Sequence, residues 1–192
     1  MINNFIAIYD DALPRTICKE IISLFNGDKH LHYSGMTSSR DGDRVDLETK
    51  QATELSVSRN GHWLEVDDIL YKNLSNYFQR YMLGLGDAYA CSVSSLDDQE
   101  YRIRRYDVGG GFNWHVDTDT VHTCGRWIAA QWYFNTVYQG GETEFMNCGT
   151  TIRPVAGRLA FFPATWTYMH RSVPTYSGPK YICSTFFSPR WN

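Results

Sequence analysis

The stretch that begins with HVD at residues 115–117 and ends with KYICSTFF at residues 180–187 decides the fold. His115 and Asp117 are two residues apart, so on a β-strand both side chains project from the same face. His170 follows 53 residues after Asp117, which is far enough for the chain to return on another strand. Two imidazoles and one carboxylate are the ligands of non-haem Fe(II) sites with open positions, and Zn2+ accepts the same ligands in hydrolytic sites. The stretch therefore predicts a metal site built between strands.

Lys180 lies ten residues after His170, at the start of a run with strand character. Lys180, Ile182, Ser184 and Phe186 alternate along this run and therefore share one face of the strand. An inward-facing lysine without a partner is costly and tends to lose its proton, and an anionic ligand removes that cost. We expect Lys180 to point inward and hold an acid cosubstrate, which favours iron over zinc. The alternative is an exposed lysine at a sheet edge.

The residues around this stretch follow an ordered pattern. In chain order it comprises Tyr106 nine residues before His115, Arg126, the apolar run 127–135, GGETEF at 140–145 and PVAG at 154–157. With His170 and Lys180, this series resembles the 2-oxoglutarate/Fe(II) dioxygenases of the prolyl 4-hydroxylase type, over about residues 100–189. A lone HxD pair is weak evidence, whereas the ordered series is specific.

The resemblance implies a fold that is mainly β with flanking α, in which a double-stranded β-helix (jelly roll) core is supported by N-terminal helices. It implies that His115, Asp117 and His170 bind Fe(II), and that Lys180 and Tyr106 hold 2-oxoglutarate. It also implies O2 as a cosubstrate and ascorbate as the reductant that restores the iron. No catalytic side chain is expected beyond these ligands.

The resemblance further implies hydroxylation of an aliphatic C–H, most simply in peptidyl proline, with Arg126 in contact with the substrate. Phe112, Phe186 and Ser188 stand where some peptidyl-proline hydroxylases carry Tyr, Trp and His, so the substrate pocket differs. A free amino acid or another small molecule is therefore an alternative substrate. Nucleobase demethylases usually hold the cosubstrate with arginine, so Lys180 argues against that branch. A non-catalytic jelly-roll binding domain is the least favoured alternative.

The expected substrate surface combines aromatic side chains with mobile loops. The aromatic wall is expected to comprise Phe112, Trp114, Trp166 and Tyr168. Residues 27–61 and 117–125 are expected to act as lids, because long loops in compact domains are often binding elements. The short interval from Asp117 to Arg126 predicts an open groove that admits a peptide chain.

Composition excludes several classes of protein. A length of 192 residues with 43% hydrophobic and 15% aromatic content is typical of one globular domain. A net charge of −3 without a basic block argues against nucleic acid as a partner. Five widely spaced cysteines without a CxxC motif indicate reduced, buried thiols in a cytoplasmic protein. Neither a signal peptide nor a membrane-spanning segment is expected, and the oligomeric state stays open.

Local patterns predict a single domain, 1–192, with helical support and loops in 1–99 and the jelly-roll catalytic core in 100–190. The predicted elements of the first part are a strand at 5–9, a helix at 14–27, polar loops at 28–62 and a helix at 63–83. Within the polar loops, residues 40–43 are expected to be an exposed loop, and Gly84 and Gly86 are expected to end the second helix. Gly140 and Gly141, after the predicted strand at 127–134, indicate a hairpin.

Overall fold

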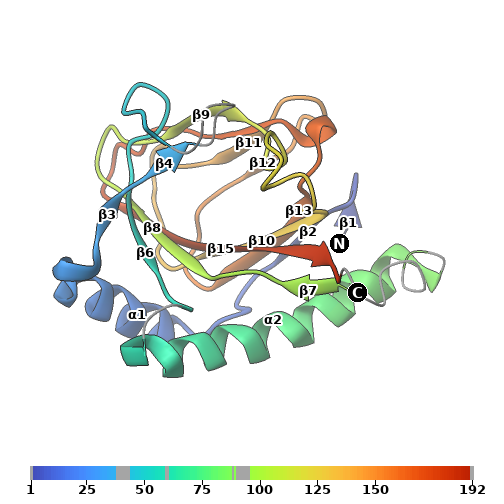
Figure 1. Ribbon diagram of the computed structural model, residues 1–192, viewed down its shortest axis with the longest axis horizontal. Coiled ribbons are helices and arrows are strands. Elements are labelled where there is room, and N and C mark those ends of the chain that lie inside the picture. The colour runs from blue at the N-terminus through green and yellow to red at the C-terminus, as the bar shows by residue number, and fades with distance from the viewer. Residues whose placement is uncertain (1, 38–43, 59–60, 88, 90–95, 191–192) are drawn as a thin grey trace.

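Two antiparallel sheets face each other in the computed structural model, which describes residues 2–37, 44–58, 61–87, 89 and 96–190 (Figure 1). In spatial order, the major sheet contains β1 (Ile2–Asn3), β2 (Ile6–Tyr9), β13 (Arg158–Pro163), β10 (Ile128–Tyr133), β15 (Lys180–Pro189), β8 (Arg102–Tyr106), β6 (Thr53–Ser56) and β3 (Tyr33–Ser34), and β7 (Leu96–Asp98) also pairs with β15. The minor sheet contains β12 (Thr151–Ile152), β11 (Thr143–Phe145), β14 (His170–Ser172) and β9 (Phe112–His115). A separate ribbon pairs β4 (Met36–Thr37) with β5 (Arg44–Val45). The predicted jelly roll is confirmed.

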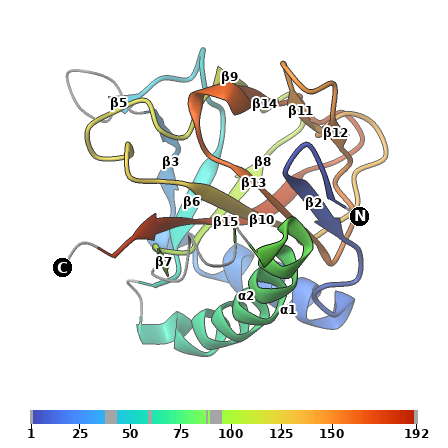
Figure 2. The ribbon, with the colours of Figure 1, turned by 90° about the vertical axis from the view of Figure 1, so that its right-hand side faces the viewer.

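Two long helices cover the outer face of the major sheet. Figure 2 shows α1 (Arg15–Gly27) and α2 (Leu64–Leu85) side by side beneath it. Short 3-10 turns lie at η1 (Lys29–Leu31), η2 (Gly61–Trp63) and η3 (Trp166–Tyr168). Leu70 and Leu74 of α2 are buried in the core between helices and sheet. None of the described helices is long and apolar enough to cross a membrane.

The central strands of the major sheet bury both of their faces, which explains their long apolar runs. Trp132 of β10 and Cys183 of β15 are Cα partners and face the core under the helices. Tyr133 and Ile182 are the next Cα partners and face the barrel interior instead. This alternation carries Lys180 of β15 into the interior, as its sequence position predicted.

The N-terminal half contributes more than helices. Strands β3 and β6 lie within residues 28–62, which the sequence pattern assigned to loops, and β6 pairs with β8 along four residues. The predicted boundary at residue 100, between helical support and catalytic core, therefore does not separate helices from strands. That the chain forms a single domain stays a prediction. The predicted loop at residues 40–43 lies outside the described residues.

Two boundary predictions were wrong. Gly84 lies inside α2, and Gly86 alone caps the helix, with a φ of 101°. The hairpin predicted at Gly140-Gly141 does not form, because β10 pairs with β13 and β15 while β11 pairs with β12 and β14. The two glycines instead lie where the chain crosses from the major to the minor sheet. A local turn signal reports the change of direction but not the sheet that the next strand joins.

This crossing provides a test of the fold. Gly140 has a φ of 74°, and a Cβ there would lie 2.1 Å from the carbonyl oxygen of Pro174. We expect Gly140→Ala to lower the free energy of unfolding by about 2 kcal/mol or more, because backbone strain and a clash add. Gly27→Ala is the matched control, since its Cβ would meet nothing within 4 Å. Equal denaturant midpoints for the two variants would contradict the crossing geometry.

Candidate active site

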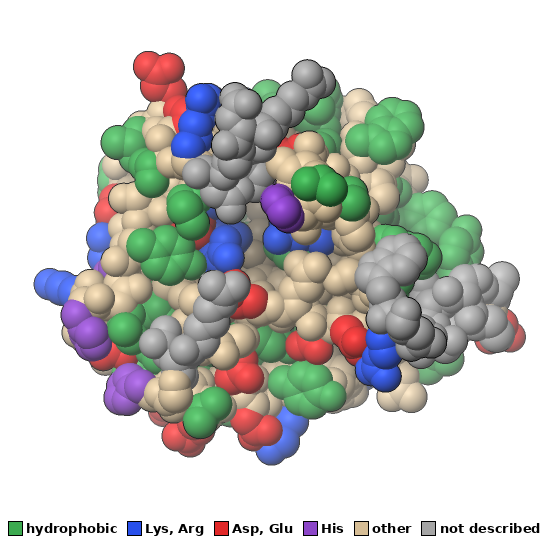
Figure 3. All heavy atoms as spheres, viewed as in Figure 1, with side chains coloured by type: hydrophobic (Ala, Val, Ile, Leu, Met, Phe, Trp, Pro, Cys, Tyr) green, Lys and Arg blue, Asp and Glu red, His purple; other side chains and the backbone are tan. Residues whose placement is uncertain are grey.

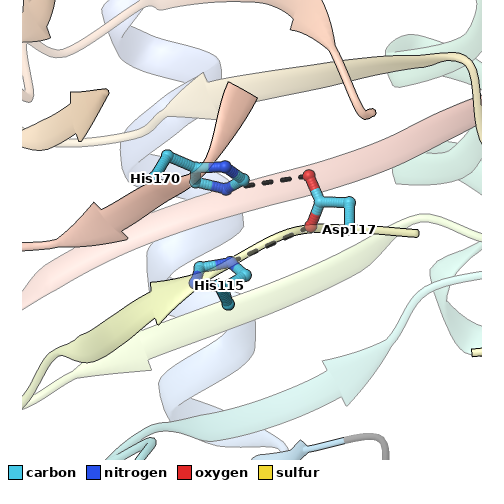
Figure 4. A group of neighbouring side chains, drawn as sticks. All are labelled: His115, Asp117 and His170. Carbon is cyan, nitrogen blue, oxygen red and sulfur yellow. Dashed lines mark ion pairs between the residues drawn. The ribbon is translucent and has the colours of Figure 1, made fainter. Parts of the chain in front are cut away.

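Three potential metal ligands converge where β9 and β14 pair. His115 ends β9, His170 begins β14, and the two are Cα partners across the minor sheet. Asp117 follows β9 by two residues and lies beside the two imidazoles, with one carboxylate oxygen facing each ring (Figure 4). Ligand atoms of the three residues all lie within 4.8 Å of one another. The structure thus brings together the three residues that the sequence predicted.

The distances suit a single ion. Asp117 Oδ1 lies 3.9 Å from His115 Nε2, and Asp117 Oδ2 lies 3.7 Å from His170 Nε2. Metal–ligand bonds of about 2.0–2.2 Å allow two ligand atoms of one ion to lie up to about 4 Å apart. Two nitrogens and one carboxylate on one side of an ion form the donor set of a non-haem Fe(II) centre. The residues therefore fit an iron ion.

Hydrogen bonds fix the orientation of both imidazoles. His115 Nδ1 lies 2.8 Å from the carbonyl oxygen of Asn113, and His170 Nδ1 lies 3.0 Å from that of Tyr168. A carbonyl accepts the Nδ1 proton, so each Nε2 lone pair is left for a metal. Burial, followed by the neighbouring His170, holds the pKa of His115 well below its usual value. The neutral imidazole is the form that binds a metal.

Aromatic rings surround the histidines. Phe112 stacks on His115 with ring centroids 3.5 Å apart. Phe145 and Phe162 lie 5.4 Å and 5.1 Å from the ring of His170. These rings exclude water from the inner side of the cluster and lower the local dielectric constant, which strengthens electrostatic interactions there.

Lys180 lies deeper in the barrel and is fully buried. It is the Cα partner of Tyr106, and its Nζ lies 4.7 Å from the centre of the Tyr106 ring. Nζ donates to the carbonyl oxygen of Gly141 at 2.8 Å and to the hydroxyl of Ser172. Burial lowers the pKa of Lys180 to about 7, opposed by the charge of Glu142. The predicted inward position is confirmed, and the exposed-edge alternative is wrong.

One cavity joins the metal ligands to Lys180. Its wall also includes Tyr106, which is buried and whose pKa burial raises above the usual value. Residues from both sheets line the cavity, among them Gln131, Thr143, Phe162, Ile182 and Ser184. A small diacid would thus have metal-binding residues at one end and a buried ammonium group at the other.

Arg126 lies beside this cavity rather than inside it. Its Nη1 donates to the carbonyl oxygen of Asp117 at 3.3 Å, and its Nε donates to Gln99 Oε1 at 3.1 Å. The guanidinium carbon lies 3.9 Å from the centre of the Phe186 ring. These contacts place Arg126 in a groove that borders the metal ligands.

With this geometry, the similarity of the chain to a known family becomes specific. Residues 101–188 match the family described as the 2OG-Fe(II) oxygenase superfamily. This part of the chain is a 2OG-Fe(II) oxygenase domain. The protein is accordingly a 2-oxoglutarate-dependent dioxygenase that uses Fe(II), 2-oxoglutarate and O2. No curated protein matches the oxygenase in a sequence search.

Solved structures share the fold of the oxygenase over nearly its whole length. A prolyl hydroxylase from Trichoplax adhaerens, in complex with a hypoxia inducible factor peptide fragment, has a TM-score of 0.77 at 17% identity and covers 97% of this chain and 84% of its own. A Pseudomonas putida prolyl-4-hydroxylase has a TM-score of 0.71 at 17% identity, and the match covers 96% of this chain and 92% of the Pseudomonas enzyme. The viral collagen prolyl hydroxylase of Paramecium Bursaria Chlorella virus-1, in complex with 2OG, has a TM-score of 0.67 at 17% identity. The match covers 97% of this chain and 97% of the viral enzyme. At this identity the similarity shows the fold.

The predicted aromatic wall forms only in part. Phe112 and Trp114 line the groove beside the metal ligands of the oxygenase. Trp166 is 75% exposed, and Tyr168 donates its hydroxyl to the carbonyl oxygen of Asn4. The η3 turn directs these two side chains away from the groove, so Phe186 takes their place in its lining. Spacing along the chain could not reveal this turn.

The sequence also left a buried charge cluster in the oxygenase unrecognised. Glu54 is fully buried and contacts Lys50, Arg104 at 2.8 Å and Arg102 at 3.7 Å. The signal that could have found it is the alternation of Arg102 and Arg104 with Ile103 on a strand whose next inward residue is Tyr106. The cysteine prediction needs a correction as well: Cys18 and Cys183 are buried, but Cys124 is exposed.

Proposed function

We propose that His115, Asp117 and His170 hold the iron and that Lys180 and Tyr106 hold 2-oxoglutarate. The observation that carries this proposal is the single cavity with the three ligands at one end and the fully buried Lys180 at the other. When bound, the iron and 2-oxoglutarate supply an oxidant from O2 that hydroxylates a C–H bond, with succinate and CO2 as coproducts. Ascorbate is proposed as the reductant that keeps the iron active.

In this proposal, the protein residues bind, orient and shield. Lys180 pairs with the distal carboxylate of 2-oxoglutarate, and Tyr106 donates its hydroxyl to that carboxylate. The pairing offsets the cost of burying the ammonium group and raises its pKa from about 7, so the lysine binds as a cation. The hydrogen bonds from His115 and His170 to backbone carbonyl oxygens keep both rings in the metal-binding tautomer. The aromatic rings keep water away from the reacting atoms.

We propose that the substrate is peptidyl proline. We also propose that the chain forms one domain and that the enzyme acts in the cytoplasm. The prolyl hydroxylases named above share the fold, and the Trichoplax adhaerens enzyme was solved with a peptide. A groove of about 480 Å³ borders His115 and Asp117 and gives a peptide access to the iron. Arg126 and the rings of Phe112 and Phe186 line this groove and suit a backbone carbonyl and a proline ring.

The substrate test measures succinate formed from 2-oxoglutarate in the presence of iron, with proline-rich peptides or with free L-proline. We expect peptides to raise succinate formation and free proline to leave it at the uncoupled rate, because the groove is open. Peptides in which alanine replaces proline are the control. Stimulation by free proline alone would establish the small-molecule alternative, and stimulation by neither would exclude proline while leaving the oxygenase in place.

A further inference from the structure

The groove beside the iron ligands, called here the cationic groove, is lined by an unusual number of basic side chains. Its basic residues are Lys50, Arg102, Arg104 and Arg126. Figure 3 shows Lys and Arg side chains at the hollow in the middle of this face. The iron ligands His115 and Asp117 form part of the same groove, so a bound substrate meets the cations and the reaction centre together.

The described carboxylates do not balance these cations. Glu54 contacts Lys50, Arg102 and Arg104, so one anion serves three cations. Glu100 pairs with Arg102 at 3.0 Å. These two carboxylates lie behind the groove lining, whereas Asp119 lines the groove itself and its carboxylate accepts a hydrogen bond from Thr123. Asp117 is assigned to the iron, so four cations face three carboxylates and one positive charge is left over.

Arg126 and Arg102 show where an anion would be bound. Among the described residues, the hydrogen-bond acceptors of Arg126 are neutral, namely the amide oxygen of Gln99 and the backbone carbonyl of Asp117. The Nε of Arg102 is buried and has no hydrogen-bond partner among the described residues. Leaving a buried charged donor without an acceptor is costly, and a ligand carboxylate would remove that cost. Guanidinium groups suit this role because they bind carboxylates through two parallel hydrogen bonds.

We infer that the substrate presents a carboxylate to Arg102 and its neighbours, and that this carboxylate belongs to an Asp or Glu within two residues of the target proline. The inference rests on the proposed peptide substrate and deepens it. Arg102 and Arg104 are two residues apart on β8, a span of about 6–7 Å. His115 and Asp117 line the same groove as these arginines, and an extended peptide also rises by about 6–7 Å over two residues, so an acidic side chain close to a proline at the iron lies in the groove with them.

The experiment compares binding of three labelled peptides of equal length with one central proline flanked by Asp, Asn or Lys. Binding is followed by fluorescence anisotropy on the protein loaded with Mn(II) and 2-oxoglutarate, and again without either. We expect the Asp peptide to bind about tenfold more tightly than the Asn peptide, with the Lys peptide weakest. The preference should shrink as salt is raised, because surface charges are screened.

Arg102→Gln tests the residue that the inference singles out. It should remove most of the preference for Asp over Asn. Arg105→Gln is the matched control, because Arg105 is the outward-facing arginine of the same strand, is about as exposed as Arg102, and pairs with Asp107. Arg104→Gln is a poorer probe, since Arg104 donates a 2.8 Å hydrogen bond to the fully buried Glu54, whereas Arg102 lies 3.7 Å from that carboxylate.

Four results would overturn the inference. The first three are equal binding of the Asp and Asn peptides, a preference that survives Arg102→Gln, and displacement of the Asp peptide by a single-stranded oligonucleotide at lower concentration than by unlabelled peptide. Displacement by free aspartate as effective as by the peptide would also overturn it, because the carboxylate would then belong to a small molecule. Failure of the proposed function appears separately, as absent iron-dependent succinate formation, and leaves the binding preference readable.

Discussion

His170→Ala is expected to lose stoichiometric iron and, with it, all measurable succinate formation. His170 supplies one of three ligand atoms, and its ring is fixed between Phe145, Phe162 and the carbonyl oxygen of Tyr168. Even outer partners of metal ligands contribute about 10–100-fold to metal affinity, so loss of a ligand should cost about 100-fold or more. His115→Ala and Asp117→Ala should behave in the same way, because a metal held by two residues dissociates readily.

The measurement is iron content after anaerobic loading and gel filtration, with succinate formation on the same samples. His62→Ala is the control, since His62 is exposed and lies against Asp28, outside the residues that line the cavity. Circular dichroism establishes that each variant is folded. Full iron retention in all three ligand variants would refute the site, whereas loss of turnover with iron retained in one of them would remove that residue alone from the ligand set.

The sequence predicted which residues lie together in the cavity, and for Lys180 it did so because strand geometry is local. The alternation in residues 180–187 put Lys180 inside the barrel, whereas Asp117 lies in the turn just past the end of β9 and meets His115 there rather than on a shared strand face. The inference for Lys180 did not need to know which strands pair. The distant His170 needed the family resemblance, because only the pairing of β9 with β14 brings it to His115.

What the sequence missed depends on pairing between distant segments. The cluster of Glu54 with Arg102 and Arg104 exists because β6 pairs with β8, and residues 53–56 are too short and polar to stand out as a strand. The hairpin prediction failed for the same reason, since Gly140 leads the chain into the other sheet. Residues that meet only through the pairing of distant strands are therefore less visible in a sequence than metal ligands, whose chemical type already narrows the choice.

Lys180→Met is expected to weaken 2-oxoglutarate binding by about 30-fold or more. Removing one member of a buried charge pair costs about 2–5 kcal/mol, and about 2 kcal/mol corresponds to 30-fold in affinity. Lys180→Arg should restore only part of the affinity, because the wider fork does not fit the place of the ammonium group. Titration calorimetry with the cosubstrate is the measurement, and Lys72→Met, at an exposed helix position paired with Asp68, is the control. Unchanged affinity in Lys180→Met would contradict the assignment.

The same substitution should stabilise the protein when no cosubstrate is bound. Burial lowers the pKa of Lys180 from 10.5 to about 7, so the unfolded chain binds its proton more tightly than the folded one. The contribution of Lys180 to the free energy of unfolding of the wild type is therefore smallest below pH 7, and it rises as the pH increases toward 10.5. Lys180→Met removes the cost of burying the ammonium group, so the variant should gain more stability over the wild type at pH 6 than at pH 9.

Saturating 2-oxoglutarate should raise the melting temperature of the wild type and leave that of the variant almost unchanged, because the ligand stabilises only a protein that binds it. A ligand carboxylate explains why the protein has a buried lysine that destabilises it when no cosubstrate is bound. If the variant were less stable than the wild type at both pH values, Lys180 would instead be a structural residue that donates hydrogen bonds to Gly141 and Ser172.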